Sequence, residues 1–221
     1  MLKHGKDYYV APAYPMLFAA GGVVCEEWIE RTRRAWLKPV FVLVLVVPAL
    51  VFMPLIAPVI SPEQFVAFIR AIHFTPPVSE HSHKRSPLPQ YYSDELGWEA
   101  MVAEVARIYH NLPPEVQGKT AIKANNFGEA GAIDYFGPKY GLPKVVCFHQ
   151  NYWYWGTHGY TGESIIVVNE GNPEHLKQLS EHAEKVGHFE YPYALENFDI
   201  WYAQGLKVNL HDIWEHEKNW D

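Results

Sequence analysis

The sequence predicts two membrane-spanning helices followed by a small α/β domain, which lies outside the cytoplasm and has a mostly parallel sheet. The first indication is that the long apolar runs lie before residue 72, whereas most of the acidic residues come after it. The second indication is a change of pattern from residue 97 onward, where segments with helical spacing of apolar residues alternate with short apolar segments typical of strands. We therefore expect the 221 residues to divide into a membrane part and a water-exposed part.

The stronger membrane signal lies between Pro39 and Pro62, a segment that contains no charged residue. Because it is longer than the ~20 residues that a helix needs to cross the hydrocarbon layer, we predict a span over about residues 39–60. A buried helix of a soluble protein is the alternative, but such helices are usually shorter and have a polar face. The segment also contains internal prolines, which a spanning helix tolerates when neighbouring helices satisfy the freed backbone groups. This favours a helix that packs within a larger transmembrane bundle.

A second uncharged stretch, residues 8–25, predicts a shorter span over about residues 9–27. A cleaved signal peptide is the rival interpretation, but the start of the stretch is rich in tyrosine and proline, and two glutamates follow it. The loop 28–38 between the two spans contains three arginines and a lysine, which the positive-inside rule places in the cytoplasm. Both ends of the membrane part, residues 1–60, are therefore expected on the outer side.

The water-exposed part is expected to begin after a linker. Residues 61–96 are rich in proline and predict an extended linker, and residues 97–221 predict the extracytoplasmic α/β domain. The expected strands are TAIKANN, VVCFH, SIIVVNE and FDIWYAQ, and the expected helices cover 97–112, 127–140, the segment from Pro173 through Val186, and HDIWEHEKNW. Strands that alternate with helices are typical of a layered α/β domain.

Polar and aromatic side chains gather after the first two predicted strands. In an α/β sheet the loops that follow parallel strands meet at one edge, so these side chains are expected to lie close together. Aromatic rings stack on the C–H faces of sugars, and amides and carboxylates bind sugar hydroxyls, so the cluster indicates glycan or acceptor recognition. The alternative is that the aromatic rings pack under loops. The candidate residues are Asn125, Glu129, His149, Asn151, Trp153 and Trp155.

Several functional classes are disfavoured by composition. The formal net charge of −7 leaves no basic surface for nucleic acid. The two cysteines, about 120 positions apart, provide no disulfide framework and no CxxC site. The chain contains no usable HExxH, GxSxG or dinucleotide motif, and Glu129 and Asp134 would point in different directions on a helix. We therefore predict no catalytic residue, no metal site and no cofactor in this chain.

The run Gly5–Pro15, GKDYYVAPAYP, resembles the late transmembrane part of bacterial glycosyltransferases with the GT-C fold. These are the protein-mannosyltransferase and aminoarabinose-transferase type, similar to glycosyltransferase family 39. The strings GEAGAIDYFGPKYGLP and HQNYWYWGTHGYTGE are similar to the C-terminal extracytoplasmic domain of a bacterial subgroup. The resemblance implies that Lys6 pairs with a carrier phosphate and that Tyr8, Tyr9 and Tyr14 line the sugar or lipid end. Ordinary interfacial lysine and tyrosine anchors are the alternative.

The resemblance implies transfer of a sugar from a polyprenyl-phosphate carrier to an acceptor outside the bacterial inner (plasma) membrane. In the family an acidic residue of the first large outer loop is the base, and this chain has no counterpart of that loop. We therefore expect the C-terminal fragment of a multi-pass enzyme, inactive alone, with any divalent metal in the part not present. Its expected partners are membrane lipid, the lipid-linked sugar and the rest of the transmembrane bundle. A non-enzymatic membrane anchor that presents an extracytoplasmic glycan-binding or interaction domain is the alternative, so enzymatic activity is left open.

Overall fold

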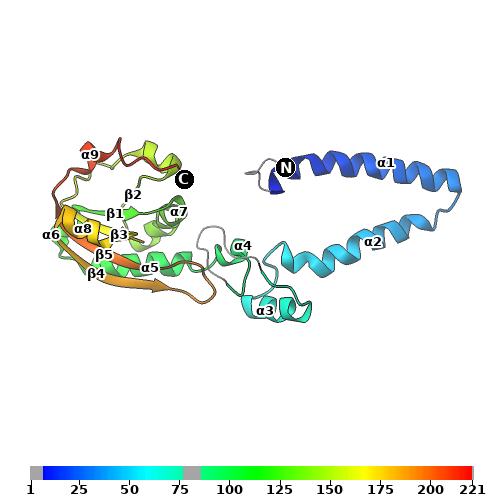
Figure 1. Ribbon diagram of the computed structural model, residues 1–221, viewed down its shortest axis with the longest axis horizontal. Coiled ribbons are helices and arrows are strands. Elements are labelled where there is room, and N and C mark those ends of the chain that lie inside the picture. Colours follow the sequence, from blue (N-terminus) through cyan, green and yellow to red (C-terminus); the bar gives the residue numbers. More distant parts are fainter. Residues whose placement is uncertain (1–6, 77–85, 221) are drawn as a thin grey trace. The chain divides into compact units, whose positions relative to one another are not determined.

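The computed structural model describes residues 7–76 and 86–220, with the side chains of Asp7 and Tyr8 left aside. The chain divides into two compact units, Met1–Ser61 and Pro62–Asp221. The first consists of helices, and the second combines helices with one sheet (Figure 1).

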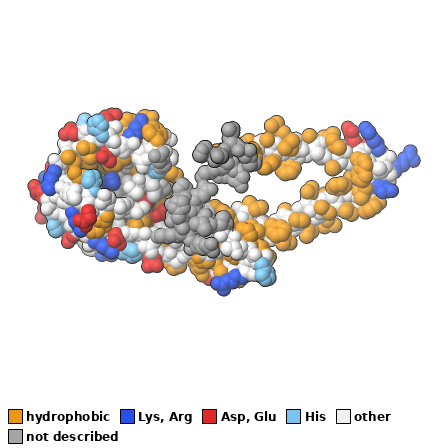
Figure 2. All heavy atoms as spheres, viewed as in Figure 1, with side chains coloured by type: hydrophobic (Ala, Val, Ile, Leu, Met, Phe, Trp, Pro, Cys, Tyr) orange, Lys and Arg blue, Asp and Glu red, His pale blue; other side chains and the backbone are white. Residues whose placement is uncertain are grey.

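The first unit is a helical hairpin. The 3-10 helix η1 (Asp7–Ala13) leads into α1 (Tyr14–Thr32), and α2 (Leu37–Phe52) returns and continues into η2 (Met53–Leu55). The turn begins at Arg33, which adopts a left-handed conformation with φ 55° and ends α1. Figure 2 shows hydrophobic side chains along both helices and basic side chains at the turn.

Among the described residues, one helical stretch, Leu37–Leu55, is long and apolar enough to cross a membrane. Its side chains are largely exposed, as Leu45 illustrates with 69%. The other helix, α1, continues beyond the predicted span 9–27 to Thr32, and it contains three glutamates and an arginine. The structure thus contains one such apolar helix where the sequence predicts two spans.

The segment 61–96, predicted as an extended linker, contains helical structure. Two helices, α3 (Pro62–Ala71) and α4 (Gln90–Ser93), belong to the second unit. Phe65 is fully buried, and its ring lies 5.3 Å from the ring of Tyr92 in an edge-on arrangement. The apolar side chains of α3 follow helical spacing, which outweighs the prolines because these lie at or beyond the ends of the helix.

The second unit is built around a five-stranded sheet with the order β2-β1-β3-β5-β4. β1 pairs in parallel with both β2 and β3, whereas β5 pairs antiparallel with both β3 and β4. The sheet is therefore mixed, and the prediction of a mostly parallel sheet is wrong. The strands are β1 (Thr120–Ala124), β2 (Val145–Cys147), β3 (Ser164–Val168), β4 (Ser180–Glu190) and β5 (Asn197–Leu206).

The error arises from the predicted helix that begins at Pro173. That helix, α8 (Pro173–Leu179), ends where Ser180 begins β4, and Ser180 Oγ donates a hydrogen bond of 2.7 Å to the carbonyl oxygen of Leu176. Ala183 and Val186 continue the helical spacing of apolar residues, but both lie in β4. Long-range pairing with β5 thus overrides the local pattern. Because β4 and β5 form a hairpin, β5 enters the sheet antiparallel to β3.

Helices cover both faces of the sheet. The first core lies between the sheet and the helices α5 (Trp98–His110) and α7 (Phe127–Phe136), and Ile122 of β1 is buried in it. The second core lies on the other face, where Ile165 packs with α8 and α9 (Leu210–Ile213). Short elements connect these layers, namely α6 (Pro114–Gln117), η3 (Gly137–Tyr140) and η4 (Gln150–Trp155). The prediction of an amphipathic helix from residue 97 is confirmed by α5.

The hairpin partner β4 is an outer strand of the sheet, and its side chains are mostly exposed. A β-bulge interrupts its pairing between Lys185 and Gly187. Lys185 Nζ and His188 Nδ1 both lie 2.6 Å from Oδ1 of Asp199 on β5. β4 itself carries three acidic side chains, Glu181, Glu184 and Glu190.

Candidate functional site

The carboxyl ends of the parallel strands converge on one buried carboxylate, that of Glu129. Glu129 is fully buried in the first turn of α7, which starts directly after β1. Asn126 Oδ1 accepts a hydrogen bond of 2.9 Å from the backbone N–H of Glu129, and the carboxylate accepts one of 3.2 Å from the backbone N–H of Asn126. This reciprocal capping box fixes where the helix begins.

Further donors surround the same carboxylate. The backbone N–H of Asn125, the side-chain amide of Asn126 and that of Asn169 donate to it at 2.9, 2.9 and 2.6 Å. Burial raises the pKa of Glu129 to about 7, while the bond from Asn169 opposes this rise and the charge of Glu196 adds to it. Glu129 thus links the end of β1 to the turn after β3 through hydrogen bonds. Because its pKa is about 7, the carboxyl group of Glu129 changes its protonation state near neutral pH.

His149 follows β2 at the same edge of the sheet and is 7% exposed. Its Nδ1 accepts a hydrogen bond of 3.3 Å from the backbone N–H of Phe127, so the ring proton is assigned to Nε2. Nε2 is buried and has no hydrogen-bond partner among the described residues. Burial also raises the pKa of the nearby Cys147 thiol, which is the opposite of what a reactive cysteine requires. These groups order the edge of the sheet and do not form an open acid–base pair.

Exposed aromatic side chains of η4 and of the C-terminal segment follow this buried cluster, and we define the aromatic surface as Tyr154, Trp155 and Trp220 together with Lys218. The rings of Tyr154 and Trp220 are 6.2 Å apart, and the ring of Trp155 packs edge-on against Tyr152 at 4.5 Å. The three rings are 64%, 55% and 50% exposed. The ammonium of Lys218 lies 4.8 Å from the ring centre of Trp220 and 5.3 Å from that of Tyr154, within the range of cation–π attraction. The C-terminal segment reaches this position by backbone pairing, since Asn219 accepts from Gln150 N–H at 2.7 Å and donates to the carbonyl of Phe148 at 3.1 Å.

Trp153 has a structural role beneath the aromatic surface. Its Nε1 donates to the carbonyl of Trp214 at 2.9 Å, and Nε1 of Trp214 donates back to the carbonyl of Trp153 at 3.0 Å. The ring of Trp153 also packs against the second core and lies 4.0 Å below the ammonium of Lys218. The pair therefore attaches η4 to the helix α9, and the indole of Trp153 is already engaged.

All six candidates from the outer part of the sequence lie at the carboxyl edge of β1 and β2 or on η4. Three of them make hydrogen bonds within the fold, namely Glu129, His149 and Trp153. The other three, Asn125, Asn151 and Trp155, have exposed side chains. The local sequence pattern did not single out Tyr154, although this residue lies within the same aromatic run. It also missed Asn169 and Trp220, because the tertiary fold alone brings them to this edge.

The membrane-proximal candidates lie in the first unit. Lys6 and the side chain of Tyr8 lie outside the described residues. Tyr9 and Tyr14 are 64% and 47% exposed, and the rings of Tyr14 and Phe18 are 6.2 Å apart. Exposed tyrosines at the start of a helix suit a boundary between lipid and water.

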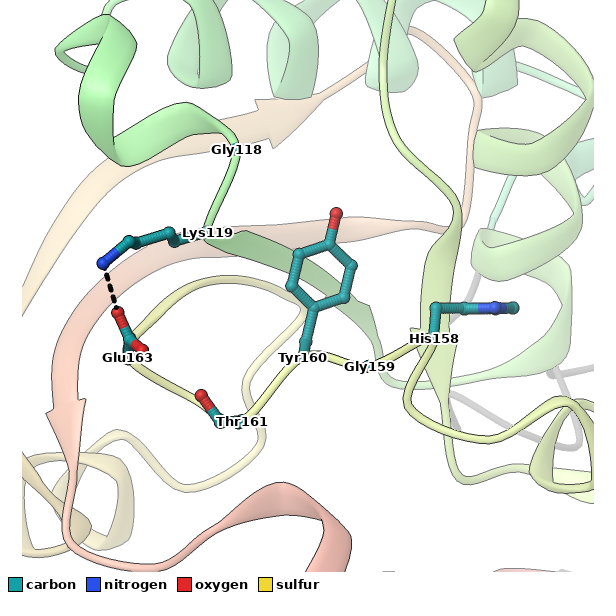
Figure 3. Close-up of a pocket in the computed structure, with 7 residues that line it drawn as sticks. All are labelled: Gly118, Lys119, His158, Gly159, Tyr160, Thr161 and Glu163. Atoms are coloured by element: carbon teal, nitrogen blue, oxygen red, sulfur yellow. Dashed lines mark ion pairs between the residues drawn. The ribbon is translucent and has the colours of Figure 1, made fainter.

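A polar pocket of about 320 Å³ lies at the opposite edge of the sheet, near the amino ends of β1 and β3 (Figure 3). An ion pair of 3.0 Å joins Lys119 Nζ to Glu163 Oε2 there, and the side chain of His158 points away from that pair. Ligands of open α/β sheets bind at the carboxyl ends of the strands, so this pocket is a weaker candidate than the aromatic edge. Within residues 7–76 and 86–220, no group of three or more His, Cys, Asp or Glu side chains is arranged to hold a metal ion.

Comparison of this chain with protein-family models, with curated proteins and with solved structures gives no match.

Proposed function

We propose that this chain is part of a membrane glycosyltransferase that takes its sugar from a polyprenyl-phosphate carrier, and that the α/β unit supplies an extracytoplasmic glycan-binding surface. The observation that carries the proposal is the aromatic surface at the carboxyl edge of the sheet. A patch of large exposed rings is costly in water and marks an interaction site. The amides of Asn125 and Asn151 are exposed at the same edge and are suited to bind hydroxyl groups.

The helical hairpin supplies the membrane part of this proposal. The apolar stretch Leu37–Leu55 crosses the bacterial inner membrane, α1 forms the second span, and the basic turn between them lies in the cytoplasm. The exposed apolar side chains contact lipid, the lipid-linked sugar and further helices of a bundle. Lys6, Tyr8, Tyr9 and Tyr14 then lie at the outer face, where the lysine pairs with the carrier phosphate and the tyrosines line the sugar or lipid end.

The catalytic base of the proposed transferase lies outside the described residues. Glu129 is an unsuitable base, because it is fully buried and four donors already occupy its carboxylate. The family resemblance of the membrane segment, rather than a constellation in the α/β unit, supports the transferase assignment. A purified preparation of this chain alone is therefore expected to bind glycan without transferring sugar.

Glycan binding is tested with the full chain in lipid nanodiscs. We expect Trp155→Ala and Tyr154→Ala to weaken binding to an oligosaccharide array at least ~tenfold, which corresponds to the loss of about 1.4 kcal/mol. Tyr135→Ala is the matched control, because Tyr135 is 79% exposed on α7 and lies outside the aromatic surface. Absence of binding to any glycan, or an equal effect of all three variants, contradicts glycan recognition. Sugar transfer by the purified chain contradicts the assignment of the base to another segment.

The alternative, a non-enzymatic membrane anchor, can be told apart from the transferase by what the helical hairpin of α1 and α2 contacts in the membrane. Photo-crosslinking groups at exposed α2 positions such as Leu45 are expected to capture other polytopic membrane segments in cells. Crosslinking to lipid alone, combined with glycan binding by the outer unit, would instead assign the chain as a membrane-anchored binding protein.

A further inference from the structure

A second cavity, of about 260 Å³, opens on the face of the sheet that carries the second core. Its walls come from β1, β3, α8 and the segment around α9. The two strands are neighbours, but the chain leaves β1 toward α7 in the first core and leaves β3 toward α8 in the second core. Such a switch in direction creates a crevice at the carboxyl ends of the strands, which is where open α/β sheets bind ligands.

The polar end of the cavity is a loosely paired lysine and glutamate. Lys123 Nζ lies 3.9 Å from Glu170 Oε2, which is too long for a hydrogen bond, and the two side chains are only 19% and 15% exposed. The other carboxylate oxygen of Glu170 accepts from the backbone N–H of Asn172 at 3.0 Å, so the carboxylate is held in place. Among the described residues, Lys123 Nζ has no hydrogen-bond acceptor, and its other neighbour is the ring of Phe148 at 5.7 Å. A largely buried ammonium without an acceptor favours one supplied by a ligand.

One part of the wall is aliphatic and includes Ile165 and Val167 of β3 together with Leu210 and Ile213. Three more polar residues line the cavity, and all three are exposed to solvent: Asn125, His175 and Glu217. The aliphatic side chains offer no hydrogen bonds, so the part of a ligand that lies against them is apolar. The volume lies just below the ~300 Å³ at which pockets for drug-sized ligands begin, which indicates a smaller molecule.

We propose that this cavity binds a small uncharged ligand with an apolar body and a hydroxyl group, and that the hydroxyl bridges Lys123 and Glu170. The gap of 3.9 Å accommodates one oxygen atom at hydrogen-bond distance from both groups. That oxygen accepts from the ammonium and donates to the carboxylate. The lysine and the glutamate balance each other in charge, and Glu217 adds a second carboxylate to the lining, so an anionic ligand meets carboxylates and a cationic ligand meets the ammonium.

The test uses the full chain in nanodiscs with ¹³C-labelled isoleucine methyl groups. Octan-1-ol, octanoate, octylammonium and glucose are titrated separately. We expect octan-1-ol to give saturable shifts of Ile165 and Ile213, which line the cavity, without shifting Ile133, which lies in the first core. Octanoate and octylammonium are expected to bind at least ~tenfold more weakly, and glucose is expected to cause no shift.

Two variants locate the binding. Lys123→Met keeps the length of the side chain and removes its donors, and we expect the dissociation constant for octan-1-ol to rise at least ~tenfold. Lys119→Met removes a lysine from a similar ion pair at the opposite edge of the sheet and is expected to leave binding unchanged. Val208→Phe fills the cavity from its wall and is expected to abolish the shifts while the fold is retained.

Three results would overturn the proposal. Shifts that do not saturate, or that affect Ile133 equally, would show partition into the apolar interior. Tighter binding of octanoate, octylammonium or glucose would assign a different ligand class. Unchanged binding in both Lys123→Met and Val208→Phe would exclude this cavity. None of these results depends on glycan binding at the aromatic surface, so the two proposals fail separately.

Discussion

Asn169 donates a hydrogen bond of 2.6 Å to Glu129, and this bond joins the turn after β3 to the helix that follows β1. Asn169 adopts a left-handed conformation with φ 59°, which asparagine tolerates better than most residues and which places its side chain at this junction. If Glu129 is protonated, Asn169 can rotate its amide so that the oxygen accepts from the carboxyl group. The junction therefore adapts to both protonation states of Glu129.

The stability of the α/β unit is expected to depend on the protonation of Glu129. Its pKa is raised from 4.5 to about 7 in the folded state, so the native protein binds more protons than the unfolded chain between these values. The contribution of this group is therefore complete below pH 4.5 and is lost as the pH rises through 7, by about 3 kcal/mol in total. Denaturant unfolding followed by tryptophan fluorescence from pH 4 to 8 measures this change.

Glu129→Gln is the control for that experiment, because it removes the titrating group and keeps the shape. We expect the free energy of unfolding of the variant to vary less between pH 4.5 and 7 than that of the unmodified chain. An identical pH profile for the two proteins would show that Glu129 does not titrate in this range.

Trp153 and Trp155 are expected to separate stability from recognition. Trp153→Phe removes a donor from the reciprocal pair with Trp214 and part of a packed ring, so we expect a loss of about 1–3 kcal/mol in the free energy of unfolding. Trp155→Phe alters a mostly exposed ring and is expected to change stability by less than about 0.5 kcal/mol. Equal effects in chemical denaturation would contradict the structural role assigned to Trp153.

Gly97 is expected to be intolerant of a side chain. It adopts φ 85° before α5, and a Cβ atom there would lie 2.9 Å from Cβ of Tyr191. Gly97→Ala should therefore cost about 2 kcal/mol or more in thermal or chemical unfolding, from the left-handed backbone and the overpacking together. Gly118→Ala is the matched control, because Gly118 has φ −62° and open space around it, and we expect a gain of about 0.4–1 kcal/mol. Similar losses at both positions would contradict this account.

A charge in the middle of α2 is expected to prevent its insertion. Leu45→Arg replaces an exposed apolar side chain, and an arginine near the centre of a spanning helix raises the insertion free energy by about 3 kcal/mol. The variant should therefore be depleted from the carbonate-resistant membrane fraction, because α1 alone would have to retain it, whereas Leu45→Phe should remain in that fraction. If Leu45→Arg stays in that fraction as completely as Leu45→Phe, the insertion of α2 is not what holds the chain in the membrane.

Local patterns were sufficient to predict the elements whose environment is uniform along their length. β1, β2 and β3 are short apolar runs buried on both faces, and α5 buries one regular stripe that includes Met101 and Val105. β4 could not be predicted, because its apolar residues match a helix and pairing with β5 alone decides otherwise. That one element determines whether the sheet is parallel or mixed.

The candidate site was predictable where its residues directly follow strands. The pattern N-x-x-E at Asn126 and Glu129 is also a recognisable helix start, and it explains why this carboxylate is buried rather than available. Trp220 joins the aromatic surface through backbone pairing of Asn219 with residues some seventy positions earlier, which no local pattern encodes. The loose pairing of Lys123 with Glu170 likewise depends on the register of β1 against β3.

The charges along β4 have a consequence for how separate copies of the protein meet. An outer strand leaves backbone groups unpaired, and such an edge can extend into the sheet of another molecule and start a fibre. On β4 the side chains of Lys185 and His188 are directed toward Asp199, while the strand also carries Glu181, Glu184 and Glu190, and Glu184 lies 3.8 Å from His182. Two such strands brought edge to edge would set these like charges against each other, and the bulge at Gly187 would disturb their register. These features of β4 disfavour edge-to-edge pairing between two copies of the protein.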